Sequence, residues 1–156
     1  MKKTIALLVL ITMLLTANLV YSFNLKNPSI FTSNELISPA NRIDKDQVHF
    51  YNDRIVIDIN QATWATYANT NSMDPVLDQG AIGIEIIPLS ETEIQIGDII
   101  TYQPDWTDGL TVHRVITTGE DEEGWYCYTK GDNTSVVDPG KIRFNQIRYI
   151  TIGVLY

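Results

Sequence analysis

The 156-residue chain has few of the residues that build disulfide frameworks, metal centres and nucleic-acid surfaces. Its single cysteine, Cys127, excludes an intramolecular disulfide, and its two histidines are too far apart to match a zinc-ligand spacing. The 11 basic side chains are outnumbered by 19 acidic ones, so a phosphate-binding surface is not expected. We therefore predict no metal, no cofactor and no nucleic-acid partner, and a buried structural thiol at Cys127.

One uncharged segment near the start of the chain is long enough to interact with a membrane. Residues 4–20, which follow Lys2 and Lys3, are rich in Leu and Ile. A membrane-spanning helix needs ~20 mostly apolar residues, whereas a cleavable secretory signal has an apolar core of ~7–15. Residues 1–23 are thus predicted to be an N-terminal membrane anchor or signal segment. In either case the two lysines stay on the cytoplasmic side and the remainder lies outside.

The rest of the sequence indicates a stalk followed by a β-rich domain. Residues 24–45 mix Asn and Ser with Pro28 and Pro39, which predicts a stalk or loop. In residues 46–156, short runs of β-branched and aromatic residues alternate with turn residues. The predicted strands are residues 54–59, 82–87, 99–102, 110–117, 125–129 and 147–155. Within the first of these, Ile55, Ile57 and Ile59 alternate as in a half-buried strand.

No long helical period follows residue 23. We therefore expect a mainly β chain, with a compact antiparallel β domain on a single N-terminal transmembrane helix.

Three short segments supply a candidate nucleophile, a candidate base and two candidate orienting carboxylates. They are Asn71-Ser72-Met73-Asp74-Pro75, Thr111-Val112-His113-Arg114-Val115, and Lys130-Gly131-Asp132-Asn133 followed by Asp138. A serine hydroxyl is a poor nucleophile at neutral pH unless a neighbouring base takes its proton. A histidine base in turn works best when a third group fixes its tautomer. Each segment alone is explained by a turn or a packed strand, but the combination favours nucleophilic catalysis.

Together these segments resemble signal peptidase I, in its endoplasmic-reticulum and archaeal branch. Ser72-Met73-Asp74-Pro75 is similar to the family's Ser-Met-x-Pro box, and Gly97-Asp98-Ile99-Ile100-Thr101-Tyr102 is similar to its Gly-Asp strand. Val112-His113-Arg114-Val115 is similar to the stretch in which this branch has a histidine and bacterial relatives have a lysine. Lys130-Gly131-Asp132-Asn133, with Asp138 beyond it, is similar to the closing box in content and spacing. The resemblance covers residues 63–144.

This resemblance implies a membrane-anchored serine endopeptidase that removes signal peptides from exported preproteins. Ser72 would be the nucleophile and His113 the base. Asp138 is the first choice to orient His113, whereas Asp132 is the second choice and would mainly shape the turn. The implied partners are signal-peptide-bearing preproteins, membrane lipid and the secretion translocon. The implied location is a single-pass membrane protein with a cytoplasmic N-terminus and an extracytoplasmic catalytic domain.

The resemblance also implies how a substrate is held. Thr70 stands where relatives often have a hydroxyl that helps to bind the oxyanion, together with the Ser72 backbone N–H. Met73 is expected to pack beneath the substrate or against lipid. An extended peptide with small residues before the cut is expected to pair with an exposed strand edge. That edge would come from residues 82–87 or from the strand before Ser72.

One position departs from the family pattern. The family usually has glycine before the nucleophile, where this chain has Asn71. If that position needs a positive φ angle, Asn is the least costly residue other than glycine, because its short polar side chain tolerates the left-handed region. The difference at Asn71 therefore concerns whether the site is active, while the other motifs still match the family pattern.

Two alternatives to an enzyme remain open. The first is a catalytically silent, membrane-anchored β module that binds secreted or nascent peptides. The second is a secreted structural protein in which Ser72 caps a turn, His113 packs in a strand and Asp132 closes a hairpin. Convergence of Ser72, His113 and one of the two aspartates in space separates an enzyme from both alternatives.

Overall fold

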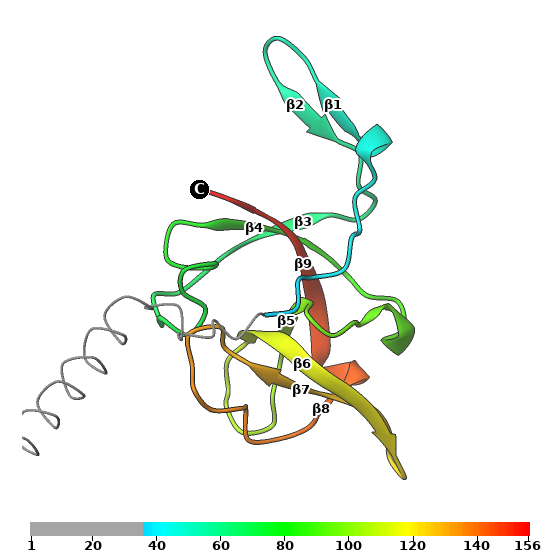
Figure 1. Ribbon diagram of the computed structural model, residues 1–156, viewed down its shortest axis with the longest axis vertical. Coiled ribbons are helices and arrows are strands. Elements are labelled where there is room, and N and C mark those ends of the chain that lie inside the picture. Colours follow the sequence, from blue (N-terminus) through cyan, green and yellow to red (C-terminus); the bar gives the residue numbers. More distant parts are fainter. Residues whose placement is uncertain (1–35) are drawn as a thin grey trace, which may run out of the picture. The chain divides into compact units, whose positions relative to one another are not determined.

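The computed structural model describes residues 36–156. The predicted anchor or signal segment and the first part of the predicted stalk lie outside the described residues. In the described part, no helix is long and apolar enough to cross a membrane. This part of the chain is mainly β, as the sequence predicts, and it forms a curled antiparallel sheet (Figure 1).

Seven strands form the main sheet, in the order β3-β4-β9-β5-β6-β7-β8. They are β3 Thr63–Thr66, β4 Ile82–Ile86, β5 Ile99–Tyr102, β6 Thr111–Asp121, β7 Gly124–Lys130, β8 Ile142–Arg143 and β9 Ile147–Leu155. The described chain also has the short 3-10 helices η2 Lys45–Gln47, η3 Glu91–Glu93 and η4 Phe144–Gln146. The C-terminal strand β9 pairs with both β4 and β5, and it therefore joins the two parts of the sheet (Figure 1).

A separate hairpin is formed by β1 (Val48–Phe50) and β2 (Ile55–Ile57). These two strands pair only with each other in the described chain (Figure 1). Phe50 and Ile55 are consequently 76% and 60% exposed. Of the alternating isoleucines predicted to be half-buried over residues 54–59, Ile57 and Ile59 are half-buried and Ile55 is exposed, and the strand itself covers only Ile55–Ile57.

The core explains why β4, β5, β6, β7 and β9 were predictable from the sequence, whereas the short strands β1, β3 and β8 were not among the predicted ranges. Ile100, Tyr102, Val115, Cys127 and Ile142 are fully buried and come from four neighbouring strands, β5 to β8. Their β-branched and aromatic side chains fit a pleated surface. Burial raises the pKa of the Cys127 thiol to about 12, which agrees with a structural and unreactive thiol.

The last residues of the predicted stalk are hydrogen-bonded to the β domain. The carboxylate of Asp98 is fully buried, and it accepts a hydrogen bond from the Ala40 backbone N–H at 3.0 Å. It also forms an ion pair with Arg42. Residues 36–42 are thus held on the domain by polar contacts that composition alone did not predict.

Gly97 allows the backbone of residues 36–42 to pack closely against the β domain. Its φ of +101° is rarely adopted by other residues, and a Cβ there would overlap the carbonyl oxygen of Ser38. Gly97→Ala should therefore lower the free energy of unfolding by more than the ~1–2 kcal/mol typical of a left-handed alanine. Denaturant unfolding measures the loss.

Two matched variants separate the causes of that loss. Gly124→Ala meets the same φ of +101° in open space, and Gly109→Ala meets neither a strained φ nor a neighbouring atom. We expect Gly97→Ala to cost most and Gly109→Ala least. Equal losses in Gly97→Ala and Gly124→Ala would contradict the close packing of residues 36–42 on the domain.

Candidate active site

Ser72 lies in a turn that follows the edge strand β3. Asn71, directly before it, has a φ of 59°, so this position does need the left-handed region that Asn tolerates. Directly after it, Met73 is only 4% exposed and packs with Leu77 and Ile99. The strained residue on one side and the buried residue on the other fix the backbone at Ser72.

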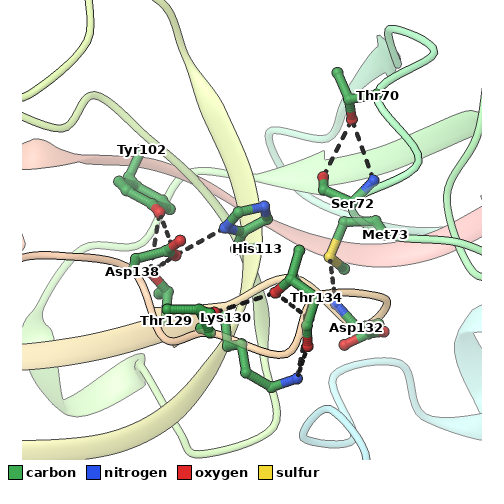
Figure 2. A network of polar contacts seen from close by, with 12 residues as sticks. Thr70, Ser72, Met73, Tyr102, His113, Thr129, Lys130, Asp132, Thr134 and Asp138 are labelled. Carbon is green, nitrogen blue, oxygen red and sulfur yellow. Dashed lines mark hydrogen bonds and ion pairs between the residues drawn. The ribbon is translucent and has the colours of Figure 1, made fainter.

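The hydroxyl group of Thr70 contacts both groups of Ser72 that an acyl-transfer reaction uses. Its Oγ1 lies 3.1 Å from Ser72 Oγ, and it accepts a hydrogen bond from the Ser72 backbone N–H at 3.5 Å (Figure 2). In this structure, therefore, Ser72 Oγ is hydrogen-bonded to Thr70 and not to His113. The pair places a hydroxyl beside the serine, where the family resemblance expects an oxyanion donor.

Met73 is buried beneath the same region. Its sulfur accepts a hydrogen bond from the Asp132 backbone N–H at 3.4 Å. Because the side chain is buried, the expected contact of Met73 with lipid is wrong. Its expected place beneath a substrate agrees with its position in the cavity wall.

His113, on β6, is oriented by Asp138. Its Nδ1 lies 2.7 Å from Asp138 Oδ2, and the two side chains are 12% and 14% exposed (Figure 2). The same carboxylate oxygen accepts hydrogen bonds from the hydroxyls of Thr129 at 2.6 Å and Tyr102 at 2.9 Å. An ionised carboxylate can only accept, so Nδ1 carries the proton and Nε2 is left as the basic nitrogen.

The surroundings keep Asp138 ionised. Burial raises the pKa of this carboxyl group, but the hydrogen bonds from His113, Thr129 and Tyr102 outweigh burial and hold the pKa below its ordinary value. Burial raises the pKa of Tyr102, which therefore remains a neutral donor. Sequence reasoning missed Tyr102 and Thr129, whose only signal was their position in aromatic and β-branched strands.

Gly131 brings the serine segment and the histidine together. A Cβ on Gly131 would lie 2.5 Å from the Ser72 carbonyl oxygen and 3.1 Å from His113 Nε2. Ser72 and His113 line one cavity of about 520 Å³, together with Thr70 and Met73. Figure 2 shows the imidazole between Asp138 and Ser72. The sequence-predicted residues Ser72 and His113 therefore share one cavity, and Asp138, which does not line it, binds the Nδ1 side of His113.

Asp132 is bound by Arg114 on β6 and not by His113. Its two oxygens accept hydrogen bonds from Arg114 Nε and Nη2, each at 2.7 Å, and both side chains are nearly buried. Asp132 does not contact His113 in this structure, so it is not the orienting group. It fixes the turn through an ion pair with a neighbouring strand. Sequence reasoning missed Arg114, although a basic residue within an apolar strand was a signal.

The loop from Lys130 to Asp138 also binds the serine segment directly. The Asn133 backbone N–H donates to the Ser72 carbonyl at 3.0 Å, and the Asn133 side chain donates to the Asn71 carbonyl at 2.9 Å. Lys130 Nζ donates to the carbonyls of Gly131 and Thr134 within this loop (Figure 2). One loop therefore positions the nucleophile segment and supplies the carboxylate that orients the base.

Only one of the two expected strand edges exists. β4 pairs with β3 on one side and β9 on the other, so residues 82–87 cannot accept a peptide strand, and that expectation is wrong. Within residues 36–156, β3 pairs with β4 alone and lies at the end of the sheet. Its residues Thr63 to Thr66 line the cavity and lead towards Ser72. The strand before Ser72 is therefore the free edge at this site.

Among residues 36–156, no three His, Cys, Asp or Glu side chains gather as metal ligands. The chain matches no protein-family model, no curated protein and no solved structure. Any functional assignment therefore depends on the sequence motifs and on the geometry of this cavity.

The buried ion pair yields a test of how this site is held. Asp132→Asn removes the charge that compensates Arg114, and breaking a buried pair costs ~3–5 kcal/mol. We expect a loss of this size in the free energy of unfolding, measured by chemical denaturation. Asp108→Asn, in an exposed turn, is the control and should be nearly neutral.

Adding Arg114→Met to Asp132→Asn should recover part of the lost stability, because no buried charge remains unpaired. If Asp132→Asn is no more destabilising than Asp108→Asn, the ion pair does not hold the loop.

Proposed function

We propose that this protein is a membrane-anchored serine endopeptidase that removes signal peptides from exported preproteins. The observation that carries the proposal is that Ser72 and His113 line one cavity while Asp138 binds the far nitrogen of His113 (Figure 2). A Ser-His-Asp site is recognised by geometry and roles and not by fold. The preprotein substrate, the membrane anchor and the extracytoplasmic location come from the resemblance to signal peptidase I.

The first step of the proposed reaction is attack by Ser72 Oγ on the scissile carbonyl. Asp138 holds the proton on His113 Nδ1, so Nε2 accepts the serine proton as the new C–O bond forms. The negative charge of Asp138 stabilises the resulting imidazolium. For this step Ser72 Oγ must exchange its hydrogen bond with Thr70 for one with His113.

That exchange also frees the Thr70 hydroxyl. Thr70 and the Ser72 backbone N–H would then both be available to donate to the oxyanion of the tetrahedral intermediate. The loss of one such donor typically costs ~10²–10³ in rate. The imidazolium next protonates the leaving amine, the peptide C–N bond breaks, and water hydrolyses the acyl-enzyme by the same steps in reverse.

The free edge of β3 supports the proposed binding of an extended peptide. The unpaired backbone groups of this strand can form a ladder with an added strand, and its residues line the cavity beside Ser72. Trp64 on this strand is 68% exposed and provides apolar surface for the peptide. The partners on this proposal are signal-peptide-bearing preproteins, membrane lipid and the secretion translocon.

A second candidate function is peptide binding without cleavage. It is favoured by one observation, the hydrogen bond of Ser72 Oγ to Thr70 in place of His113. On this alternative the same β3 edge and cavity hold secreted or nascent peptides, and Ser72 serves only to fix the turn.

Ser72→Ala separates the two functions. The full-length protein is combined with a preprotein that carries a small-x-small site, and its products are separated by mass. We expect cleavage by the unchanged protein and none by Ser72→Ala, because the nucleophile is absent. Ser135→Ala, an exposed serine in the loop that supplies Asp138, is the control and should keep full activity.

Cleavage at an unchanged rate by Ser72→Ala would refute the protease. Binding of the preprotein without any cleavage by the unchanged protein would favour the silent module.

A further inference from the structure

The cavity beside Ser72 and His113 contains polar groups that the proposed reaction does not use. We call Tyr67, Glu85, Thr101 and Thr151 the polar cluster. Glu85, on β4, is 2% exposed, and its Oε1 accepts hydrogen bonds from the hydroxyls of Thr101 at 2.8 Å and Thr151 at 3.4 Å. Tyr67, Glu85 and Thr101 line the same cavity as the candidate catalytic residues. A carboxyl group is therefore held in the wall of this cavity.

Two polar groups of the cluster have no partner among residues 36–156. The Tyr67 hydroxyl is buried without a hydrogen bond. Both hydrogen bonds of the Glu85 side chain end on Oε1, which leaves Oε2 without a protein partner, although this oxygen is not fully enclosed as the Tyr67 hydroxyl is. A buried polar group without a partner is costly, and such groups are rare unless a ligand or water satisfies them.

Strand geometry places these two groups near each other. The Tyr67 hydroxyl lies over Gly83, at the place where a side chain of that residue would stand. Gly83 and Glu85 are two residues apart on β4, so they present the same face of the sheet. The Tyr67 hydroxyl and the Glu85 carboxyl group thus meet on the cavity side of β4.

The protonation of Glu85 indicates the kind of ligand that fits. Burial raises the pKa of this carboxyl group, and hydrogen bonds from Thr101 and Thr151 oppose the rise only in part. Burial thus disfavours the charged form, and the partners that this carboxyl group has in the structure are two neutral hydroxyls. A neutral hydroxyl or carboxamide complements such a group better than an ammonium or a carboxylate does.

We infer that Glu85 and Tyr67 are specificity-determining residues, which make this subsite prefer small peptide side chains with a hydroxyl or carboxamide over alanine. The inference rests on the proposed function, since the peptide is its substrate. Alanine would cover the Tyr67 hydroxyl and the Glu85 carboxyl group without offering a hydrogen bond to either. A site built to hydrogen-bond a substrate group discriminates against the analogue that lacks it.

Preproteins that differ by one atom test this preference. One pair has Ser or Ala at the residue before the cut, and a second pair has Ser or Ala two residues earlier. For the full-length protein we expect the kcat/KM ratio of Ser over Ala to be about 10 at one of these positions, the size of one net hydrogen bond.

Variants assign the preference to the polar cluster. Glu85→Met should bring the ratio close to 1, whereas Glu85→Gln should retain most of it, because a carboxamide still donates and accepts. Tyr67→Phe removes only a hydroxyl that has no partner, so it should fold normally and lower the ratio. If Glu85→Met does not fold, the result for Tyr67→Phe decides the test. Glu91→Gln, an exposed glutamate outside the cavity, should leave the ratio unchanged.

Binding of fluorescently labelled forms of the same peptides to Ser72→Ala provides a readout without cleavage. If the unchanged protein cleaves neither substrate but Ser72→Ala binds the Ser peptide about 10-fold more tightly, the protease fails and the inference stands. If Ser72-dependent cleavage occurs with a ratio near 1, or with a ratio that Glu85→Met and Tyr67→Phe leave unchanged, the inference is overturned and the protease stands. The absence of both cleavage and binding overturns both.

Discussion

The contact of one loop with the serine segment is the constraint on which the candidate site depends. The loop from Lys130 to Asp138 holds the Ser72 carbonyl through the Asn133 backbone N–H, and it presents Asp138 to His113. Its closest approach is at Gly131, where a side chain would meet both Ser72 and His113. A displacement of this loop would therefore separate Ser72, His113 and Asp138, the proposed nucleophile, base and orienting carboxylate.

The buried ion pair between Arg114 and Asp132 fixes the position of the loop from Lys130 to Asp138, and it adds little to the net stability of the fold. The Arg114–Asp132 pair links the loop to β6, and Arg114 also donates to the Gly97 carbonyl at 2.7 Å. Such pairs contribute little net stability compared with apolar packing, but the loss of one partner is costly. They accordingly favour a single geometry for the loop and for His113 on the same strand. A preorganised site of this kind stabilises charge without reorganisation during the reaction.

Sequence patterns predicted the features that depend on local chemistry. β5 and β9 were predicted with their observed bounds. The ranking of Asp138 above Asp132 as the partner of His113 came from the family resemblance and not from local chemistry. The missed features depend on pairing between distant segments. Glu85 contacts Thr151, 66 positions away, and β4 lost its expected edge because the C-terminal strand pairs with it. Periodicity indicates which residues are buried in a strand, but it does not indicate which strand or side chain lies beside them.

Cleavage by Asp138→Asn tests the central claim most directly. Asparagine keeps an acceptor for Thr129 and Tyr102 but removes the charge that stabilises the His113 imidazolium. The full-length variant and the unchanged protein are compared on one preprotein, and their melting temperatures are recorded alongside. The account predicts an unchanged fold and a loss of about 10⁴ in kcat, the loss that this substitution causes in other Ser-His-Asp sites. Full activity in a folded Asp138→Asn variant would contradict the Ser72–His113–Asp138 assignment.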